Sequence, residues 1–266
     1  MKIQMRRPFA SLVLGVLALS AAPVHAEQVA GKSFVEQFDH LDKNRWYISD
    51  GWSNGDHQNC TWSARQVAVE DGKLKLSFAR QKYKQRDHVC AEVQTKARFG
   101  YGTFEVRMKA VGGSGLNTGF FSYIGPTDKQ PHDEIDFEVL GKDPSKVQVN
   151  QYVNGKSVGS AKLADVPGGA DKGFHDYAFV WQKDRIAWYV DGTLVEEATD
   201  PAKLPSHASK IFLSVWGSDT LKSWMGAFAD PDGPVAAEVD RVAYTAPGDA
   251  CQFPESIVCK LKQGTQ

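Results

Sequence analysis

Hydrophobic and polar residues alternate with period two over most of the chain, as they do in strands with one buried face. Strands of this kind are expected at residues 73–78, 104–109, 177–182, 186–190 and 211–216. Asp191-Gly192 supplies a tight hairpin turn between two of them. Helical periodicity is limited to a turn around residues 201–204. The pattern predicts an all-β fold, a two-sheet antiparallel β-sandwich of the concanavalin A-like jelly-roll type.

The first 26 residues have the composition of an export signal. Lys2, Arg6 and Arg7 precede a short apolar run, and small residues lead to a cleavage site after Ala26. The run is shorter than the roughly 20 apolar residues that span a bilayer, although a retained N-terminal anchor is the alternative. Residues 27–266 are therefore expected to form one secreted domain, extracellular or periplasmic, with no membrane attachment.

Charge narrows the classes of partner. Loss of the signal leaves 28 Lys and Arg against 32 Asp and Glu, a mildly acidic chain without a basic run for nucleic acid. A chain of this length can form a single large β-domain, and we expect a monomer.

Four cysteines follow the signal, and export favours disulfides. The spacing favours Cys60 with Cys90 and Cys251 with Cys259, although the sequence permits three pairings. The second pair would fasten a C-terminal tail that begins near Thr245. A zinc site is not indicated by any Cys-x-x-Cys motif or His-rich cluster.

The segment 132–140, His-Asp-Glu-Ile-Asp-Phe-Glu-Val-Leu, carries the clearest chemical signal. Alternate side chains of a strand share a face, so Glu134, Asp136 and Glu138 lie together, opposite an apolar face. Crowded carboxylates repel one another and raise at least one pKa. Their Cα atoms span about 13 Å from Glu134 to Glu138, so the two carboxyls can lean to within about 5–6 Å. That is the separation in a retaining glycosidase, with Asp136 assisting one or both.

Two alternatives remain for this strand, an exposed acidic face and a calcium-binding edge. Calcium usually takes ligands from a loop rich in Asp, Asn and Gly, so catalysis is the preferred interpretation. Neighbouring segments also place amides and aromatic rings on shared faces, which suits a sugar-binding cleft. Those residues are Gln148, Asn150 and Tyr152 in one segment and Phe212, Ser214 and Trp216 in the other.

The segment from Phe34 to about Tyr244 resembles glycoside hydrolase family 16, in its bacterial lichenase branch. The similar motifs are Glu134-Ile-Asp-Phe-Glu138, Asp50-Gly-Trp-Ser-Asn-Gly55, Asn59-Cys-Thr-Trp62 and Tyr101-Gly-Thr-Phe-Glu-Val-Arg107. The resemblance implies a jelly-roll with a cleft, and no cofactor for catalysis. By motif position it implies Glu134 as nucleophile, Glu138 as general acid/base and Asp136 as the assisting carboxylate.

The resemblance also implies further site residues. It pairs Cys60 with Cys90 and suggests a structural calcium ion held by backbone oxygens near Gln37 and Gly72 and by Asp240. Substrate would bind at Trp52, Asn54, Glu92, Phe121, Tyr123, His132, Gln148, Asn150, Tyr152 and Trp216.

Two departures from lichenases concern the substrate. His132 stands where a tryptophan usually stacks on a sugar ring, and Gln94 follows Glu92 where an arginine is usual. These features and the cysteine-containing tail more closely resemble the rhizobial endo-1,3-1,4-β-glycanases that depolymerise the acidic polysaccharide succinoglycan. Lys82, Lys84 and Arg86 could meet acidic groups of such a polymer, although a solvated loop explains them more simply.

The sequence thus predicts a retaining endo-β-glycanase that acts on an extracellular polysaccharide, with succinoglycan preferred. A lichenase acting on mixed-linkage β-glucan is the alternative within the same chemistry, as is transglycosylation. A non-catalytic carbohydrate-binding jelly roll is the alternative from another class, because fold does not fix function.

Overall fold

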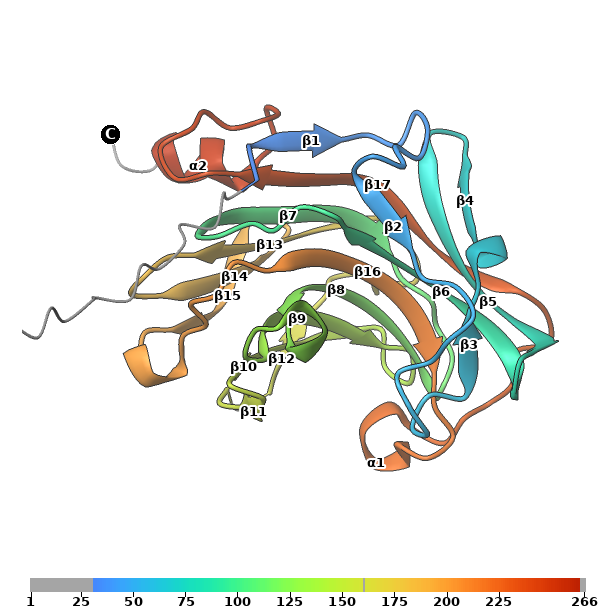
Figure 1. The fold of residues 1–266 in the computed structure, drawn as a ribbon. Coiled ribbons are helices and arrows are strands. Elements are labelled where there is room, and N and C mark those ends of the chain that lie inside the picture. Colours follow the sequence, from blue (N-terminus) through green and yellow to red (C-terminus); the bar gives the residue numbers. More distant parts are fainter. Residues whose placement is uncertain (1–30, 160, 264–266) are drawn as a thin grey trace, which may run out of the picture.

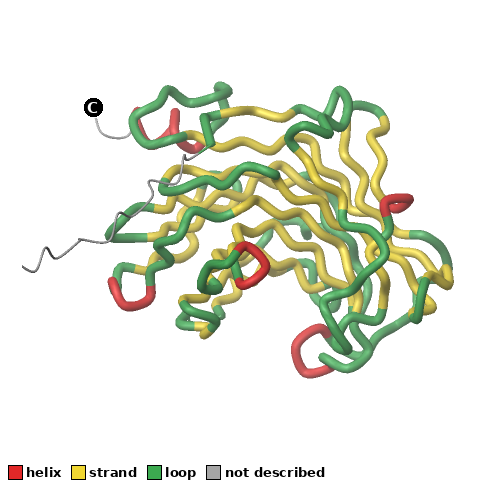
Figure 2. The backbone as a smooth tube through the Cα atoms, viewed as in Figure 1, coloured by secondary structure: helices red, strands yellow, loops and turns green. Residues whose placement is uncertain are grey.

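The computed structural model describes residues 31–159 and 161–263. The expected export signal, residues 1–26, lies outside these described residues. Strands are the main regular structure of the described chain and helices are short, as the period-two pattern predicts (Figure 2). Within the described ranges, no helix is long and apolar enough to cross a membrane.

Two curved layers of strands form the fold (Figure 1). The layer that we name the cleft sheet runs in the order β2, β6, β16, β8, β9, β10, with β11 and β12 on the outer side of β10. Its strands are β2 (Trp46–Ile48), β6 (Arg86–Thr95), β16 (Lys210–Gly217), β8 (Leu116–Ile124), β9 (Asp133–Leu140), β10 (Lys146–Val153), β11 (Lys156–Ser157) and β12 (Lys162–Asp165).

The other layer, the back sheet, runs in the order β4, β5, β17, β7, β13, β14, β15, and β1 also pairs with β17. Its strands are β4 (Val67–Glu70), β5 (Lys73–Tyr83), β17 (Val235–Thr245), β7 (Gly102–Lys109), β13 (His175–Trp181), β14 (Ile186–Val190), β15 (Thr193–Ala198) and β1 (Phe34–Glu36). The short β3 (Cys60–Trp62) runs parallel to β6. The antiparallel sandwich expected from the sequence is confirmed.

Aromatic rings fill the space between the two sheets. Phe120 of β8 and Phe137 of β9 lie with ring centroids 6.2 Å apart, and Phe120 reaches Phe179 of the back sheet at 5.7 Å. Phe179 stacks in turn on Phe104 at 4.6 Å. Burial of such rings supplies much of the stabilisation of a sandwich core. Because Phe137 points into this core, its neighbours Asp136 and Glu138 must point out of it.

Two turns expected from the sequence are present, and two short helices were not expected. Asp191 and Gly192 join β14 to β15 with φ values of 50° and 83°, as a tight hairpin with two left-handed residues requires. A 3-10 turn at Pro201–Lys203 matches the turn expected there. The short helices α1 (Lys222–Met225) and α2 (Ile257–Gln263) were not predicted, because one or two turns show little helical periodicity.

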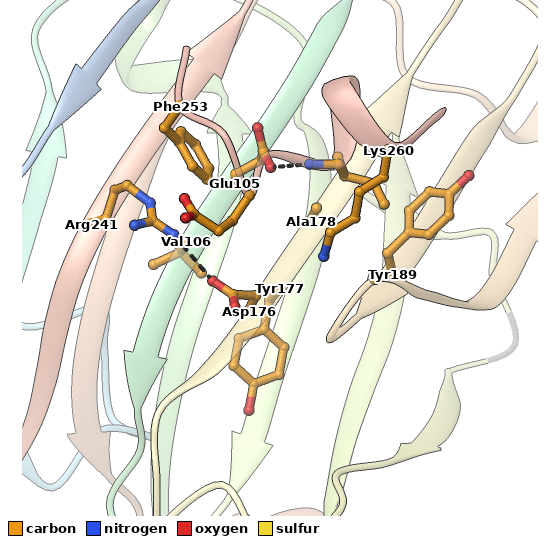
Figure 3. Close-up of a pocket in the computed structure, with 12 residues that line it drawn as sticks. Glu105, Val106, Asp176, Tyr177, Ala178, Tyr189, Arg241, Phe253 and Lys260 are labelled. Atoms are coloured by element: carbon orange, nitrogen blue, oxygen red, sulfur yellow. Dashed lines mark hydrogen bonds and ion pairs between the residues drawn. The ribbon is translucent and has the colours of Figure 1, made fainter. Parts of the chain in front are cut away.

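The C-terminal tail is fastened to the outer face of the back sheet (Figure 3). Glu105 of β7 accepts hydrogen bonds from Ser256 Oγ at 2.7 Å and from the backbone N–H of Ile257 at 2.8 Å, at the start of α2. Arg241 lies 3.9 Å over the ring of Phe253 and pairs with Asp176. A disulfide joins Cys251 to Cys259 within this tail. The enclosed space at this junction is about 20 Å³, which is too small for a sugar.

Candidate active site

A cleft of about 960 Å³ lies over the outward face of the cleft sheet. Its residues come from β6, β8, β9 and β16 and from the segment around β2 and β3, so distant parts of the chain meet there. Its lining includes Tyr47, Trp52, Asn54, Glu92, Phe121, Tyr123, His132, Glu134, Glu138, Lys210, Phe212 and Trp216.

Strand pairing arranges the three acidic side chains of β9 in rows across this face. Glu134 pairs with Tyr152 on one side and Tyr123 on the other, and Asp136 pairs with Asn150 and Phe121. Residues paired across antiparallel strands point to the same side of the sheet. The three carboxylates therefore lie on the same face of β9, as the alternation in the sequence predicts. On that face, which lines the cleft, their neighbours are aromatic and amide side chains.

Space opens beside the third acid. Glu138 pairs with Gly119, and Gly119 pairs with Ser214 of β16. A Cβ atom at Gly119 would lie 3.1 Å from the Ser214 hydroxyl and 3.3 Å from the Phe121 ring, so a larger residue would crowd this row. The missing side chain leaves Glu138 accessible from the cleft.

Asp136 lies at the centre of the three acids and is only 2% exposed. Burial raises its pKa well above the usual range, and the charges of Glu134 and Glu138 and a hydrogen bond with Glu134 raise it further. A protonated Asp136 can donate a hydrogen bond to a neighbouring carboxylate, which an ionised one cannot. The raised pKa of Asp136 therefore favours a proton at the centre of the three acids.

The surroundings of Glu138 also favour its protonated form. Burial is the larger cause and the charge of Glu134 the smaller one, and together they raise its pKa to about 8, against a lowering effect of Asn117. Asn117 Nδ2 donates to Glu138 Oε1 at 3.0 Å. A carboxylic acid that stays protonated near neutral pH is suited to donate a proton to a leaving group.

Glu134 has a different partner. Its Oε2 lies 2.6 Å from Nε2 of His132, and the hydrogen bond to Glu134 is the main cause that raises the pKa of His132. The two outer acids of β9 therefore sit in contrasting surroundings, Glu134 beside a basic ring and Glu138 beside an amide. Such a contrast is what separates a nucleophilic carboxylate from a proton donor.

Most of the residues expected to bind substrate line the cleft. They are Trp52, Asn54, Glu92, Phe121, Tyr123, His132 and Trp216. Trp52 is 41% exposed, so its ring is available to a ligand, while Glu92 is 3% exposed and accepts a hydrogen bond from Ser49 Oγ at 2.5 Å. Burial raises the pKa of Glu92 to about 7.

The other three expected residues lie on β10, beside the acids. Asn150 and Tyr152 flank Asp136 and Glu134 across the strand pairing, and Gln148 flanks Glu138. Gln148 Oε1 accepts a hydrogen bond from Trp224 Nε1 at 2.9 Å. These two residues and Glu138 line a second cavity of about 130 Å³, which also includes Leu163. Glu138 thus borders both cavities.

The structure adds lining residues that the sequence analysis did not include. Lys210 is one of them, and it has the same parity on β16 as Phe212 and Trp216, which the sequence analysis had placed on the cleft face. Extending the alternation by one more step along this strand would have found Lys210. Tyr47 and Asp128 carry no such signal, because their positions depend on strand pairing and loop packing. Lys210 binds both oxygens of Asp128, at 2.8 and 3.1 Å.

The basic segment at residues 80–88 is not part of the cleft lining. Arg86 donates to the backbone oxygen of Gly55 and to Asp56, and Lys84 lies 5.6 Å over the ring of Tyr83. These local contacts account for the charges of Lys84 and Arg86, in line with the simpler explanation from sequence.

The residues expected at a calcium site approach one another along β17. Phe34–Glu36 and Lys73–Tyr83 pair with different parts of β17, and Gln37 and Gly72 adjoin the ends of those two strands. The register of β17 against β7 shifts between Val239 and Arg241, at Asp240. The Asp240 carboxylate also lies 3.6 Å from Arg107 Nε. Among the described residues, no three His, Cys, Asp or Glu side chains form a metal-binding group.

Both disulfides in the described chain join the pairs that the spacing favours. Cys60 and Cys90 have Cα atoms 5.8 Å apart and link β3 to β6 next to the cleft. Gln58 Nε2 donates to the Cys60 carbonyl at 2.9 Å. The Cys60–Cys90 disulfide therefore holds the segment that carries Trp52 and Asn54 against the cleft sheet.

Comparisons with known proteins agree with this geometry. Residues 54–231 match the model of glycosyl hydrolases family 16. Endo-1,3-1,4-beta-glycanase ExoK of Rhizobium meliloti is 61% identical over 232 residues, which cover 87% of this chain and 86% of that protein. The beta-glucanase of Paenibacillus macerans is 42% identical over 219 residues, covering 82% and 90%.

Solved structures show the same fold. The beta-glucanase of Bacillus licheniformis superposes with a TM-score of 0.76 at 38% identity, covering 81% of this chain and 99% of that one. Family membership decides against a non-catalytic binding module, the alternative that the sequence had left. This chain belongs to glycosyl hydrolases family 16 and is a glycoside hydrolase.

Proposed function

We propose that the chain is a retaining endo-β-glycanase that hydrolyses internal β-1,3/1,4-glucosidic bonds of an extracellular polysaccharide. One observation supports this most directly: Glu134 and Glu138 face one cleft from a single strand, on either side of a buried Asp136 with a raised pKa. Two carboxyl groups in this arrangement provide a nucleophile and a proton donor for double displacement.

The reaction assigns one role to each acid. Glu134 attacks the anomeric carbon while Glu138 gives its proton to the departing glycosidic oxygen. Glu138 then takes a proton from water, which displaces Glu134 from the same carbon and restores the original configuration. Asp136 holds a proton between them and orients the attacking carboxylate.

The cavities on both sides of Glu138 support cleavage within a chain. The proton donor contacts the leaving half of the substrate, so the cavity with Gln148 and Trp224 would hold that half. The larger cleft, with the exposed rings of Tyr47 and Trp52, would hold the half that is transferred to Glu134. Pyranose C–H faces pack on such rings.

The preferred substrate that we propose is the acidic exopolysaccharide succinoglycan, with mixed-linkage β-glucan as the second candidate. His132 and Gln94 depart from the lichenase pattern, and Lys96 lines the cleft together with Lys210, which is paired with Asp128. The relative at 61% identity is named an endo-1,3-1,4-beta-glycanase, and that at 42% identity a beta-glucanase. Loss of viscosity measured in parallel on succinoglycan, barley β-glucan and laminarin would rank these substrates.

The catalytic assignment is tested by Glu134→Gln and Glu138→Gln. Each variant should release reducing ends from the best of those polymers at least about 10³-fold more slowly than the wild type. Near-wild-type release by either one would refute the assignment. Proton NMR of the first product should show the β-anomer, and an initial α-anomer would exclude double displacement.

We further propose that residues 27–266 act as one secreted, monomeric domain with a structural calcium ion. Gln37 and Gly72 would supply backbone oxygens and Asp240 a carboxylate, away from the cleft. Calcium would then raise the melting temperature of the chelator-treated protein, and Asp240→Asn would weaken that response. A melting temperature indifferent to calcium in the wild type would rule out the ion.

A further inference from the structure

His132 is built into the cleft by three separate contacts. Its ring stacks on Tyr152 of β10, with centroids 5.2 Å apart and an interplanar angle of 13°. Tyr123 of β8 meets the same ring edge-on at 5.0 Å and 64°. Two aromatic neighbours on the strands that flank β9 therefore limit the rotation of the imidazole, and its Nε2 lies 2.6 Å from Glu134 Oε2.

The backbone of His132 is fixed as well. The turn between β10 and β11 consists of Asn154 and Gly155, with φ values of 51° and 76°. The N–H of Gly155 donates to the His132 carbonyl at 2.8 Å, and the N–H of Asn154 donates to Asp133 Oδ1 at 3.2 Å. Asn and Gly are favoured in such tight hairpin turns. The two backbone N–H groups of this turn thus hold the segment that leads into β9.

Resting on the function proposed above, we propose that His132 is a positioning residue that holds Oε2 of Glu134, so that Oε1 is the oxygen that attacks the sugar. An ionised carboxylate only accepts hydrogen bonds, so His132 must donate through Nε2. Its two flanking tyrosines fix the direction of that donor. This role differs from stacking on substrate, because the ring already stacks on Tyr152 and meets Tyr123 edge-on within the protein.

The same bond serves both halves of the reaction. In the first half, Oε1 bonds to the anomeric carbon as the glycosidic oxygen leaves with the proton of Glu138. Oε2 then becomes the carbonyl oxygen of the ester. In the second half, Glu138 takes a proton from water, the water oxygen bonds to the anomeric carbon, and the electron pair of the C–Oε1 bond returns to Glu134. A fixed donor at Oε2 stabilises the charge that returns.

The charged form of His132 is favoured by its surroundings. The hydrogen bond to Glu134 and the charges of Glu134 and Asp133 raise its pKa, against the lowering effect of burial. The titratable groups that face it are Glu134 of β9, two residues further along the chain, and the phenols of Tyr152 and Tyr123 from the neighbouring strands. Asp133 is turned away and binds His207 at 2.7 Å.

The test compares His132→Phe with His132→Gln. Phenylalanine keeps the packing between the two tyrosines and removes the donor, so kcat should fall by at least about 10-fold while KM changes little. Loss of the positive charge should move the acid limb of the kcat/KM profile to higher pH. Glutamine restores a neutral donor, so it should recover part of kcat and keep the shifted limb. His40→Phe, at an exposed surface position, is the matched control.

The outcomes separate this inference from the proposed function. If Glu134→Gln is inactive while folded His132→Phe keeps the wild-type kcat and acid limb, His132 has no positioning role. A rise in KM alone would instead identify His132 as a substrate contact and would also overturn the proposal. If Glu134→Gln remains active, the assignment of the nucleophile fails first. Circular dichroism and melting temperature confirm that each variant is folded.

Discussion

Asn117 on β8 donates a hydrogen bond from Nδ2 to Oε1 of Glu138 at 3.0 Å, diagonally across the pairing of β8 with β9. The amide favours the ionised form of Glu138, while burial and the charge of Glu134 favour the protonated form. The balance between these effects sets the pH at which the proton donor is lost. Asn117 is fully buried, so solvent does not compete for this bond.

Asn117→Leu should therefore move the basic limb of the kcat/KM profile to higher pH. Removal of the donor leaves the neutral form of Glu138 more favoured, so its pKa rises above the present value of about 8. The pH profile measures this, with exposed Asn44→Leu as control. A basic limb that stays in place or moves to lower pH would contradict the interpretation.

Asp136→Asn should abolish most activity and stabilise the fold at neutral pH. The folded-state pKa of this acid is raised, so the folded protein binds a proton that the unfolded chain has released. Stability is therefore lost as pH rises from the unfolded value of 3.8 toward the folded value. Asparagine cannot ionise, so the variant does not lose stability in this way as the pH rises. Urea unfolding should show the variant more stable than the wild type at pH 7, with the difference closing near pH 3.

Glu92→Gln should remove a second pH-dependent loss of stability. Burial raises the pKa of Glu92 from 4.5 to about 7. The contribution of Glu92 to the free energy of unfolding is therefore fully present below pH 4.5 and is lost as the pH rises to about 7. The change corresponds to about 3 kcal/mol in the free energy of unfolding. The variant should gain that amount above pH 7 and nothing near pH 4. Equal gains at both pH values would show that ionisation of Glu92 is not the cause.

The two disulfides should differ in their effect on activity. Replacement of Cys60 and Cys90 by serine opens a loop of 30 residues and should cost about 3.6 kcal/mol on the chain-entropy model. It should also lower activity, because the bond holds the Trp52 segment beside the cleft. Replacement of Cys251 and Cys259 opens 8 residues and should cost about 2.5 kcal/mol.

Activity per folded molecule is the measurement that separates these variants. The second pair lies in the tail, on the back sheet, so its loss should leave the rate on polysaccharide unchanged at a temperature where both variants are folded. Equal losses of rate in the two variants would mean that the Cys60–Cys90 bond has no specific effect on the cleft.

Local periodicity was enough to predict several of the strands and the face on which their side chains lie. The alternation of Ile135, Phe137 and Val139 with three acids placed the carboxyl groups on one side of β9, because a strand repeats every two residues. Family motifs in the same segment identified candidate residues for catalysis. The Asp191-Gly192 turn followed from the few residues that accept positive φ values.

The sequence by itself thus determined several strands, their outward faces and the candidate acids, since each depends on neighbours along the chain. Tertiary structure decided which side chains form hydrogen bonds with one another. The bonds of His132 to Glu134, Asn117 to Glu138 and Trp224 to Gln148 depend on which strands pair and how far each is shifted. The burial of Glu105 by the tail is of the same kind. Burial and charge at these contacts set the pKa values, and they are properties of the assembled sheets.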